Sequence, residues 1–141
     1  MTRVCFLHGT EDRIQAAAAW INAAWSRKER VTVFAPQRDM AERLDRQLWV
    51  APPLSFVPHC RSGSPLQDET PILITDRPDP ALHHQNLLNL SDEIPPDFTR
   101  FDTLVEIVST VPEVRNPARE RVHHYKEQHC EVQFEDISHG R

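Results

Sequence analysis

The chain has 141 residues, the length of one ordinary domain that can bury its own core. Its hydrophobic content of 39% and charged content of 26% are typical of globular proteins, and no apolar run reaches the roughly 18 residues that a membrane span requires. The net charge of −5 argues against a protein that grips nucleic acid over its whole surface, although a local basic patch is compatible with it.

The N-terminus and the cysteines indicate a cytoplasmic protein. The apolar stretch at residues 4–7 is too short for a signal peptide. The three cysteines, Cys5, Cys60 and Cys130, are odd in number and far apart, so no disulfide framework follows and a reducing compartment suits them.

Strands and helices alternate in the first half of the chain. Short apolar or β-branched runs predict the strands, and apolar residues at helical spacing predict the helices. In chain order we expect a strand at 4–7, a helix at 13–30, a strand at 31–35, a helix at 39–48, an extended segment at 55–59 and a strand at 72–75. A polar stretch at 60–70 predicts a loop.

The second half is less regular. Two prolines in succession predict a turn at 95–98, and the apolar run at 103–109 fits either a strand or the end of a short helix. The remaining expected elements are a strand at 87–91, a charged helix at 117–128 and a short edge strand at 131–134.

This order of elements predicts the fold class. Alternating strands and helices favour a Rossmann-like open, mostly parallel sheet with helices on both faces. We expect a single α/β domain at residues 1–134, followed by a polar tail at 135–141 that frays.

The sequence lacks the signals of a cofactor site. Only three glycines occur, and the turn that holds Gly9 also carries Glu11 and Asp12, which repel phosphate. The pairs His59-Cys60, His123-His124 and His129-Cys130 offer metal-ligand types without the spacing of a zinc site. Cys60 beside His59 would be a nucleophile and base only if spatial geometry supported them. We therefore expect no catalytic residue, no metal and no cofactor.

Two aromatic residues stand close to a proline-rich link. Trp49 ends a predicted helix, Pro52 and Pro53 stiffen the chain, and Phe56 follows in the extended segment. Large aromatics fixed by prolines make good interface anchors, because little entropy is left to lose on binding. The alternative is that both rings belong to the core.

A basic stripe is expected on the last helix. Arg115, Arg119, Val122 and Lys126 are four, three and four residues apart, which places them on one helical face. We expect the helix to start at Pro117, with Arg115 just before its first turn. Such a stripe suits an acidic peptide with an apolar side chain and a free carboxylate. The alternative is a solvated charged face.

Both stretches resemble a known family. "LDRQLWVAPPLSFVPH" at 44–59 and "ARERVHHYK" at 118–126 closely resemble two signatures of the chi subunit of bacterial DNA polymerase III, in the same order and at the same separation. The resemblance implies a Rossmann-like sheet without nucleotide and no intrinsic catalysis. It also implies two partners, which are the psi subunit of the clamp loader and the acidic C-terminal tail of single-stranded-DNA-binding protein. DNA would be contacted only indirectly.

The resemblance assigns residues to each partner. It matches Trp49 and Phe56 to psi binding. The positions that match tail binding are Val108, Arg115, Arg119, Val122, Lys126 and Val132. Three positions depart from the family pattern, because Arg115 replaces a lysine, Val122 replaces an aromatic and His129 replaces a glycine.

Two other functions remain open from the sequence. One is an uncharacterised small enzyme that uses the loop after the first strand or Cys60. The other is a protein that itself binds single-stranded DNA, against which the net charge of −5 argues.

Overall fold

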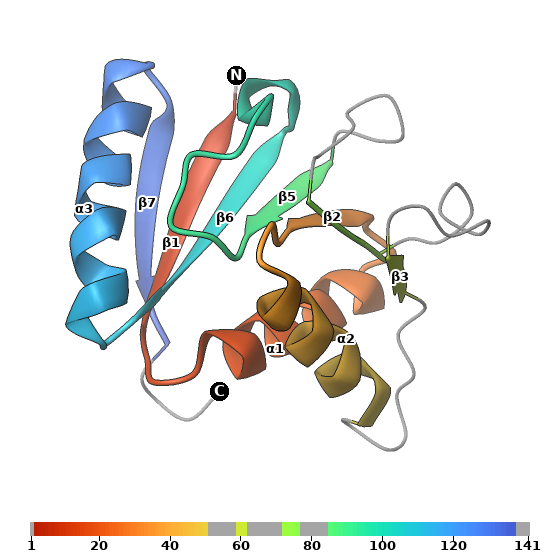
Figure 1. Cartoon of the computed structure of the whole chain (residues 1–141). Coiled ribbons are helices and arrows are strands. Elements are labelled where there is room, and N and C mark those ends of the chain that lie inside the picture. Colours follow the sequence, from red (N-terminus) through yellow and green to blue (C-terminus); the bar gives the residue numbers. More distant parts are fainter. Residues whose placement is uncertain (1, 51–58, 62–71, 77–84, 138–141) are drawn as a thin grey trace.

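The computed structural model describes residues 2–50, 59–61, 72–76 and 85–137. These residues form β1 (Arg3–Thr10), α1 (Arg13–Ser26), β2 (Val31–Phe34), α2 (Arg38–Val50), β3 (His59–Arg61), β4 (Ile72–Thr75), β5 (Asn86–Asn89), a 3-10 turn η1 (Phe98–Arg100), β6 (Thr103–Ser109), α3 (Pro112–Glu127) and β7 (Glu131–Asp136) (Figure 1).

The strands of the described residues form a seven-stranded sheet in the order β3-β4-β2-β5-β6-β1-β7. Each neighbouring pair is parallel. Residues of α1 and α2 belong to one apolar cluster, and residues of α3 belong to another. Helices therefore cover both faces, and the Rossmann-like open sheet is confirmed (Figure 1).

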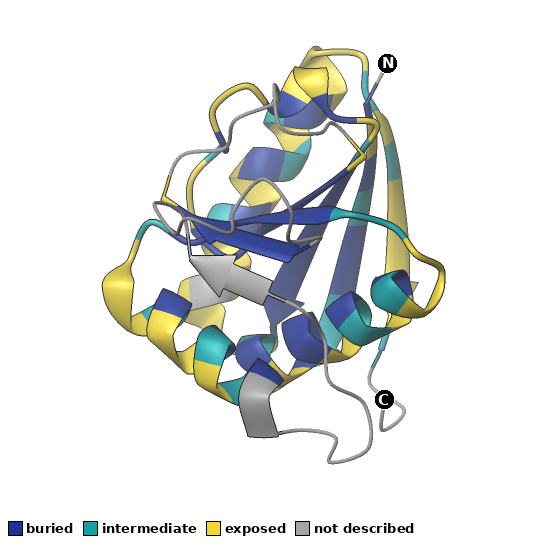
Figure 2. Cartoon of the chain, turned by 90° about the vertical axis from the view of Figure 1, so that its right-hand side faces the viewer, coloured by how far each residue is buried: buried dark blue, intermediate teal, exposed yellow. Residues whose placement is uncertain are grey.

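The central strands are buried along their whole length, including polar residues such as Thr32 and Asn89. β2, β4 and β5 are buried at every position, which is expected where helices or loops cover both faces of a parallel sheet. Figure 2 shows the buried strands in dark blue beneath helices whose outer sides are exposed. The edge strand β7 differs, because most of its residues are exposed.

The turn after β1 starts a helix. The Asp12 carboxylate accepts hydrogen bonds from the backbone N–H groups of Ile14 (3.0 Å) and Gln15 (3.2 Å). Asp12 is thus the N-cap of α1 and satisfies amides that have no partner inside the helix. The carboxylate occupies the position where a nucleotide-binding fold would present free amides to a phosphate.

Several expected boundaries are corrected. The helix expected at 13–30 ends at Ser26, because Lys28 adopts a left-handed backbone (φ 61°) and its N–H bonds to the Trp25 carbonyl. The loop expected at 60–70 was wrong at its start, since Cys60 and Arg61 pair with β4 as part of β3. Residues 103–109, for which the sequence allowed either a strand or the end of a short helix, form the strand β6.

The last helix starts earlier than predicted. α3 begins at Pro112, five residues before the expected start at Pro117, so Arg115 lies within the helix. Pro112 suits the first helical turn, where the missing N–H needs no partner. Pro117 lies in the interior, and the amide it lacks would have bonded only to the carbonyl of Glu113 in the exposed first turn. β7 also continues to Asp136, two residues past the expected domain boundary.

Candidate protein-interaction surface on α3 and β7

The inner face of α3 carries a buried ion pair. Arg121 donates to the Glu106 carboxylate through Nε and Nη2, both at 3.0 Å, and both side chains are almost completely buried. The Tyr125 hydroxyl, one helical turn later, donates to the same carboxylate. The helix is therefore fixed on β6 by charge-assisted hydrogen bonds as well as by apolar packing.

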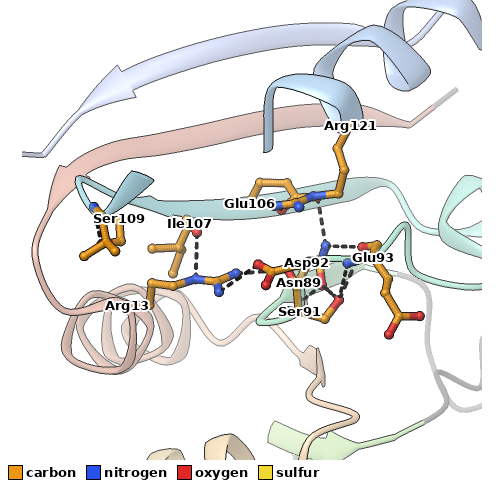
Figure 3. A network of polar contacts seen from close by, with 10 residues as sticks. Arg13, Asn89, Ser91, Asp92, Glu93, Glu106, Ile107, Ser109 and Arg121 are labelled. Carbon is orange, nitrogen blue, oxygen red and sulfur yellow. Dashed lines mark hydrogen bonds and ion pairs between the residues drawn. The ribbon is translucent and has the colours of Figure 1, made fainter. Parts of the chain in front are cut away.

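The ion pair belongs to a larger buried network (Figure 3). The Asn89 side chain on β5 donates through Nδ2 to Glu106 at 2.9 Å, and its Oδ1 accepts hydrogen bonds from the Ser91 backbone N–H and hydroxyl. Arg13, at the start of α1, donates to the backbone carbonyls of Ile107 (3.1 Å) and Ser91 (3.0 Å). These contacts join α1, β5, β6 and α3 at the centre of the sheet.

The network shifts two protonation equilibria. Burial raises the pKa of the Tyr125 phenol, and the neighbouring Glu106 carboxylate raises it further. Burial lowers the pKa of the Arg121 guanidinium, but the charge of Glu106 and the hydrogen bonds to it outweigh burial and raise the pKa. Arg121 and Tyr125 therefore stay protonated, as the network requires.

Sequence reasoning missed this network. The signals were Glu106 inside the apolar run of β6, and Arg121 and Tyr125 four residues apart on one helical face. A charge in the middle of a buried strand requires a partner. The stripe predicted from the sequence does not include Arg121, which is 3% exposed.

The outer face of α3 carries the predicted basic stripe. Arg115, Arg119 and Lys126 are exposed, and Val122 is partly buried. Helical spacing places the four on one line along the helix. Glu113, Glu120 and Glu127 recur at intervals of seven and lie on a separate line, on average about 130° away around the axis. The cations are therefore grouped on one side of the helix.

The predicted apolar residues lie beneath or beside this stripe. Val108 on β6 is buried in the same apolar cluster as Ala118 and Tyr125, while Val122 and Val132 are partly buried against that cluster. Thus Val122 and Val132 reach the surface and Val108 supports it from below. We call Arg115, Arg119, Val122, Lys126 and Val132 the α3–β7 surface.

The turn between α3 and β7 includes His129. His129 has a left-handed backbone (φ 62°), and the next N–H, that of Cys130, bonds to the Tyr125 carbonyl at 3.0 Å. Glycine adopts this conformation with less strain than histidine.

The predicted psi-binding residues are outside the described side chains. Trp49 is in α2, but its side chain is not described, and Phe56 falls in the segment 51–58. Their roles stay a prediction from the sequence.

A small-molecule site would be expected at the carboxyl ends of the strands. A cavity of about 400 Å³ lies there, after β2 and β4, and its lining includes Arg38, Thr75 and Asp76. The described residues that line it include no cysteine, histidine or serine. The described lining therefore does not contain Cys60, the nucleophile that the alternative enzyme hypothesis named.

Metal and thiol chemistry gain no support from the described residues. Within 2–50, 59–61, 72–76 and 85–137, no three histidine, cysteine or acidic side chains gather as a metal site would require. Burial raises the pKa of the Cys5 thiol, helped by Glu135, and burial also raises that of Cys130. Both thiols are therefore poor nucleophiles at neutral pH. No helix of the described chain is long and apolar enough to cross a bilayer.

Comparison with known proteins decides the family. Residues 1–133 match the family model described as "DNA polymerase III chi subunit, HolC". The chain belongs to the DNA polymerase III chi subunit family. It is similar to DNA polymerase III subunit chi of Pseudomonas aeruginosa, with 28% identity over 82% of this chain and 80% of the relative. The corresponding protein of Haemophilus influenzae is 29% identical over 97% of this chain and 93% of the relative. As a member of this family, the chain is an accessory subunit of DNA replication.

Proposed function

We propose that this chi-family subunit is an adaptor that binds the acidic C-terminal tail of single-stranded-DNA-binding protein through the α3–β7 surface. The observation that carries the proposal is the line of exposed cations on α3 beside partly buried valines. The tail combines carboxylates with a terminal phenylalanine, so it requires charge-assisted donors next to an apolar contact.

Each residue has a proposed role. Arg115, Arg119 and Lys126 pair with the aspartates and the terminal carboxylate, and Val122 and Val132 contact the apolar end of the tail. Val108 keeps the surface in place from the core. Because a short peptide buries little area, we expect a Kd in the micromolar range, about −8 kcal/mol.

A peptide titration tests this function. The peptide ends in acidic residues followed by Pro-Phe, and a second version carries an amide in place of the terminal carboxylate. We expect the free acid to bind and the amide to bind several-fold more weakly, with both affinities falling as salt rises. Equal affinity of the two versions would contradict a role for the terminal carboxylate.

We also propose that Trp49 and Phe56 contact the psi subunit or a functional substitute in the clamp loader. This proposal rests on the family signature at residues 44–59 and on the suitability of proline-stiffened aromatics as interface anchors. Co-purification with psi is expected for the parent and for Arg119→Ala, and is expected to fail for Trp49→Ala with Phe56→Ala. Retained psi in the double variant would contradict the assignment.

The proposed adaptor has no catalytic activity of its own and works in the cytoplasm with the replication complex. It contacts DNA only through single-stranded-DNA-binding protein, in keeping with its net charge of −5. Purified protein is expected to hydrolyse no ATP and to leave single-stranded DNA unshifted in a gel until single-stranded-DNA-binding protein is added. A direct shift would support the DNA-binding alternative instead.

A further inference from the structure

The cavity at the carboxyl ends of β2 and β4 has no part in the proposed adaptor function. Its volume of about 400 Å³ lies in the range of pockets that bind small molecules. In the sheet, β5, β6 and β1 separate β2 from β7. The cavity is therefore a feature distinct from the α3–β7 surface.

The cavity forms where β2 and β4 stop pairing. The Ala35 N–H bonds to the Thr75 carbonyl at 2.8 Å and extends the ladder one residue past β2. Pro36 has no N–H to continue the ladder, and α2 begins two residues later at Arg38. Ala35 and Ala41 both line the cavity, and their small side chains leave space that larger residues would occupy.

The connections around β2 favour a ligand at this place. β2 leads through α2 to β3, which lies beyond β4, whereas its other neighbour β5 leads to β6 in the opposite direction (Figure 1). Open α/β sheets bind small ligands beside such a reversal, at the carboxyl ends of the strands. The cavity lies at the ends of β2 and β4, next to this reversal.

The lining combines buried apolar residues with two exposed charges. Ala35, Ala41 and Ile74 are buried, whereas Arg38 and Asp76 are exposed. Among the residues that the structure describes, neither charged side chain makes a hydrogen bond or an ion pair, with the other or with a third residue. Two opposite charges thus border one apolar cavity without neutralising each other.

The start of α2 adds to the positive charge on the Arg38 side. The Ala41 N–H bonds to the Gln37 carbonyl, so the amides of residues 38–40 precede the first bond within the helix. The positive end of the helix dipole therefore lies beside Arg38 and favours an anionic group. Asp39 belongs to the same turn but is not among the residues that line the cavity.

We propose that this cavity binds a small zwitterion of the aliphatic amino-acid type. The carboxylate of the ligand pairs with Arg38 at the start of α2, and its ammonium group pairs with Asp76. Its aliphatic side chain lies against Ala35, Ala41 and Ile74. This site does not depend on the proposed adaptor function.

A heteronuclear NMR titration of the full chain with L-leucine tests the proposal. We expect saturable shifts of the backbone amides of Ala35, Arg38 and Asp76, with a Kd of about 1 mM or below, because so small a ligand makes few contacts. Leucinamide lacks the carboxylate and isocaproic acid lacks the ammonium group. Each should bind about tenfold more weakly than L-leucine, as expected for the loss of one charge-assisted pair.

Variants separate the two charges. Arg38→Ala and Asp76→Ala should each weaken L-leucine binding about tenfold, and both should fold because the positions are exposed. Arg43→Ala and Glu42→Ala are the matched controls, since both residues are exposed on α2 and neither lines the cavity. The controls should bind L-leucine as the parent does.

Several results would overturn the proposal. One is the absence of saturable shifts with L-leucine, and another is a set of shifts confined to residues outside the cavity. Undiminished binding by folded Arg38→Ala or Asp76→Ala would do the same, as would an equal loss in the controls. Shifts with inorganic phosphate but not with L-leucine would show an anion site in place of a zwitterion site.

Discussion

The two faces of α3 use arginine in opposite ways. Arg121 is 3% exposed and makes two hydrogen bonds to a buried carboxylate, whereas Arg119, two residues earlier, is exposed. The buried arginine fixes the helix on the sheet, and the exposed one remains available to a partner. Whether an arginine of α3 stabilises the fold or remains available for binding therefore depends on whether it faces the sheet, and not on its place in a basic run of the sequence.

The largest effect is expected from Arg121→Ala. Removal of one partner leaves the Glu106 carboxylate buried without its counter-charge, which typically costs about 3–5 kcal/mol. Urea denaturation should show a loss of this size in the free energy of unfolding. A loss below about 1 kcal/mol would mean that the pair is dispensable and that apolar packing alone holds α3.

Arg13→Ala should also destabilise the protein. Its guanidinium bonds to two backbone carbonyls and to Asp92, so the loss should be about 1.5–3 kcal/mol by the same denaturation measurement. Arg13 is therefore unsuitable as a control for peptide binding. An unchanged free energy of unfolding would contradict a stabilising role for the hydrogen bonds that Arg13 makes beside β6.

Alkaline pH offers a third test of the buried face. The pKa of Tyr125 is raised in the folded protein by burial and by Glu106, so the folded state keeps the phenolic proton after the unfolded state has lost it near pH 10. Its contribution to stability is thus complete below about pH 10 and falls above it by about 1.4 kcal/mol per pH unit.

The chain has one tyrosine, so tyrosinate absorbance reports on Tyr125 alone. We expect that absorbance to appear together with unfolding, and we expect Tyr125→Phe to lack this part of the pH dependence. Ionisation of Tyr125 at its ordinary pKa in the folded protein would show that the phenol is accessible to solvent.

The smallest effect on stability is expected at the outer face. Arg119→Ala should change the free energy of unfolding by no more than about 0.5 kcal/mol, because exposed side chains away from buried contacts contribute little. A loss comparable to that of Arg121→Ala would erase the distinction between the two faces.

The fold could be predicted from the sequence because its signals are local. A short apolar run predicts a strand such as Ile72–Thr75 without knowledge of what the strand pairs with. Helical spacing likewise predicts α1 from Ile14, Ala17, Ala18 and Ile21 alone. The start of α3 could not be predicted, since Pro112 and Pro117 both suit a first turn and only packing on β6 decides between them.

The outer stripe of α3 could be predicted because it depends only on spacing along one helix. The buried network could not be predicted in this way. Spacing alone identifies Arg115, Arg119, Val122 and Lys126 as one face. The hydrogen bonds that link Arg121, Glu106 and Asn89 join residues far apart in the chain. The exposure of Phe134 was not predicted, because a single aromatic residue in an edge strand gives no periodic signal. Contacts that depend on tertiary arrangement became visible only in the structure.

The central claim is that the exposed arginine line of α3 binds an acidic tail. The most direct measurement is a calorimetric titration of the Pro-Phe peptide into the parent, Arg119→Ala and Arg43→Ala, where Arg43 is an exposed arginine on α2, across the sheet. We predict a loss of about 1–3 kcal/mol in binding free energy for Arg119→Ala and none for Arg43→Ala. Equal affinity of folded Arg119→Ala and the parent would contradict the claim and leave the stripe as a solvated helix face.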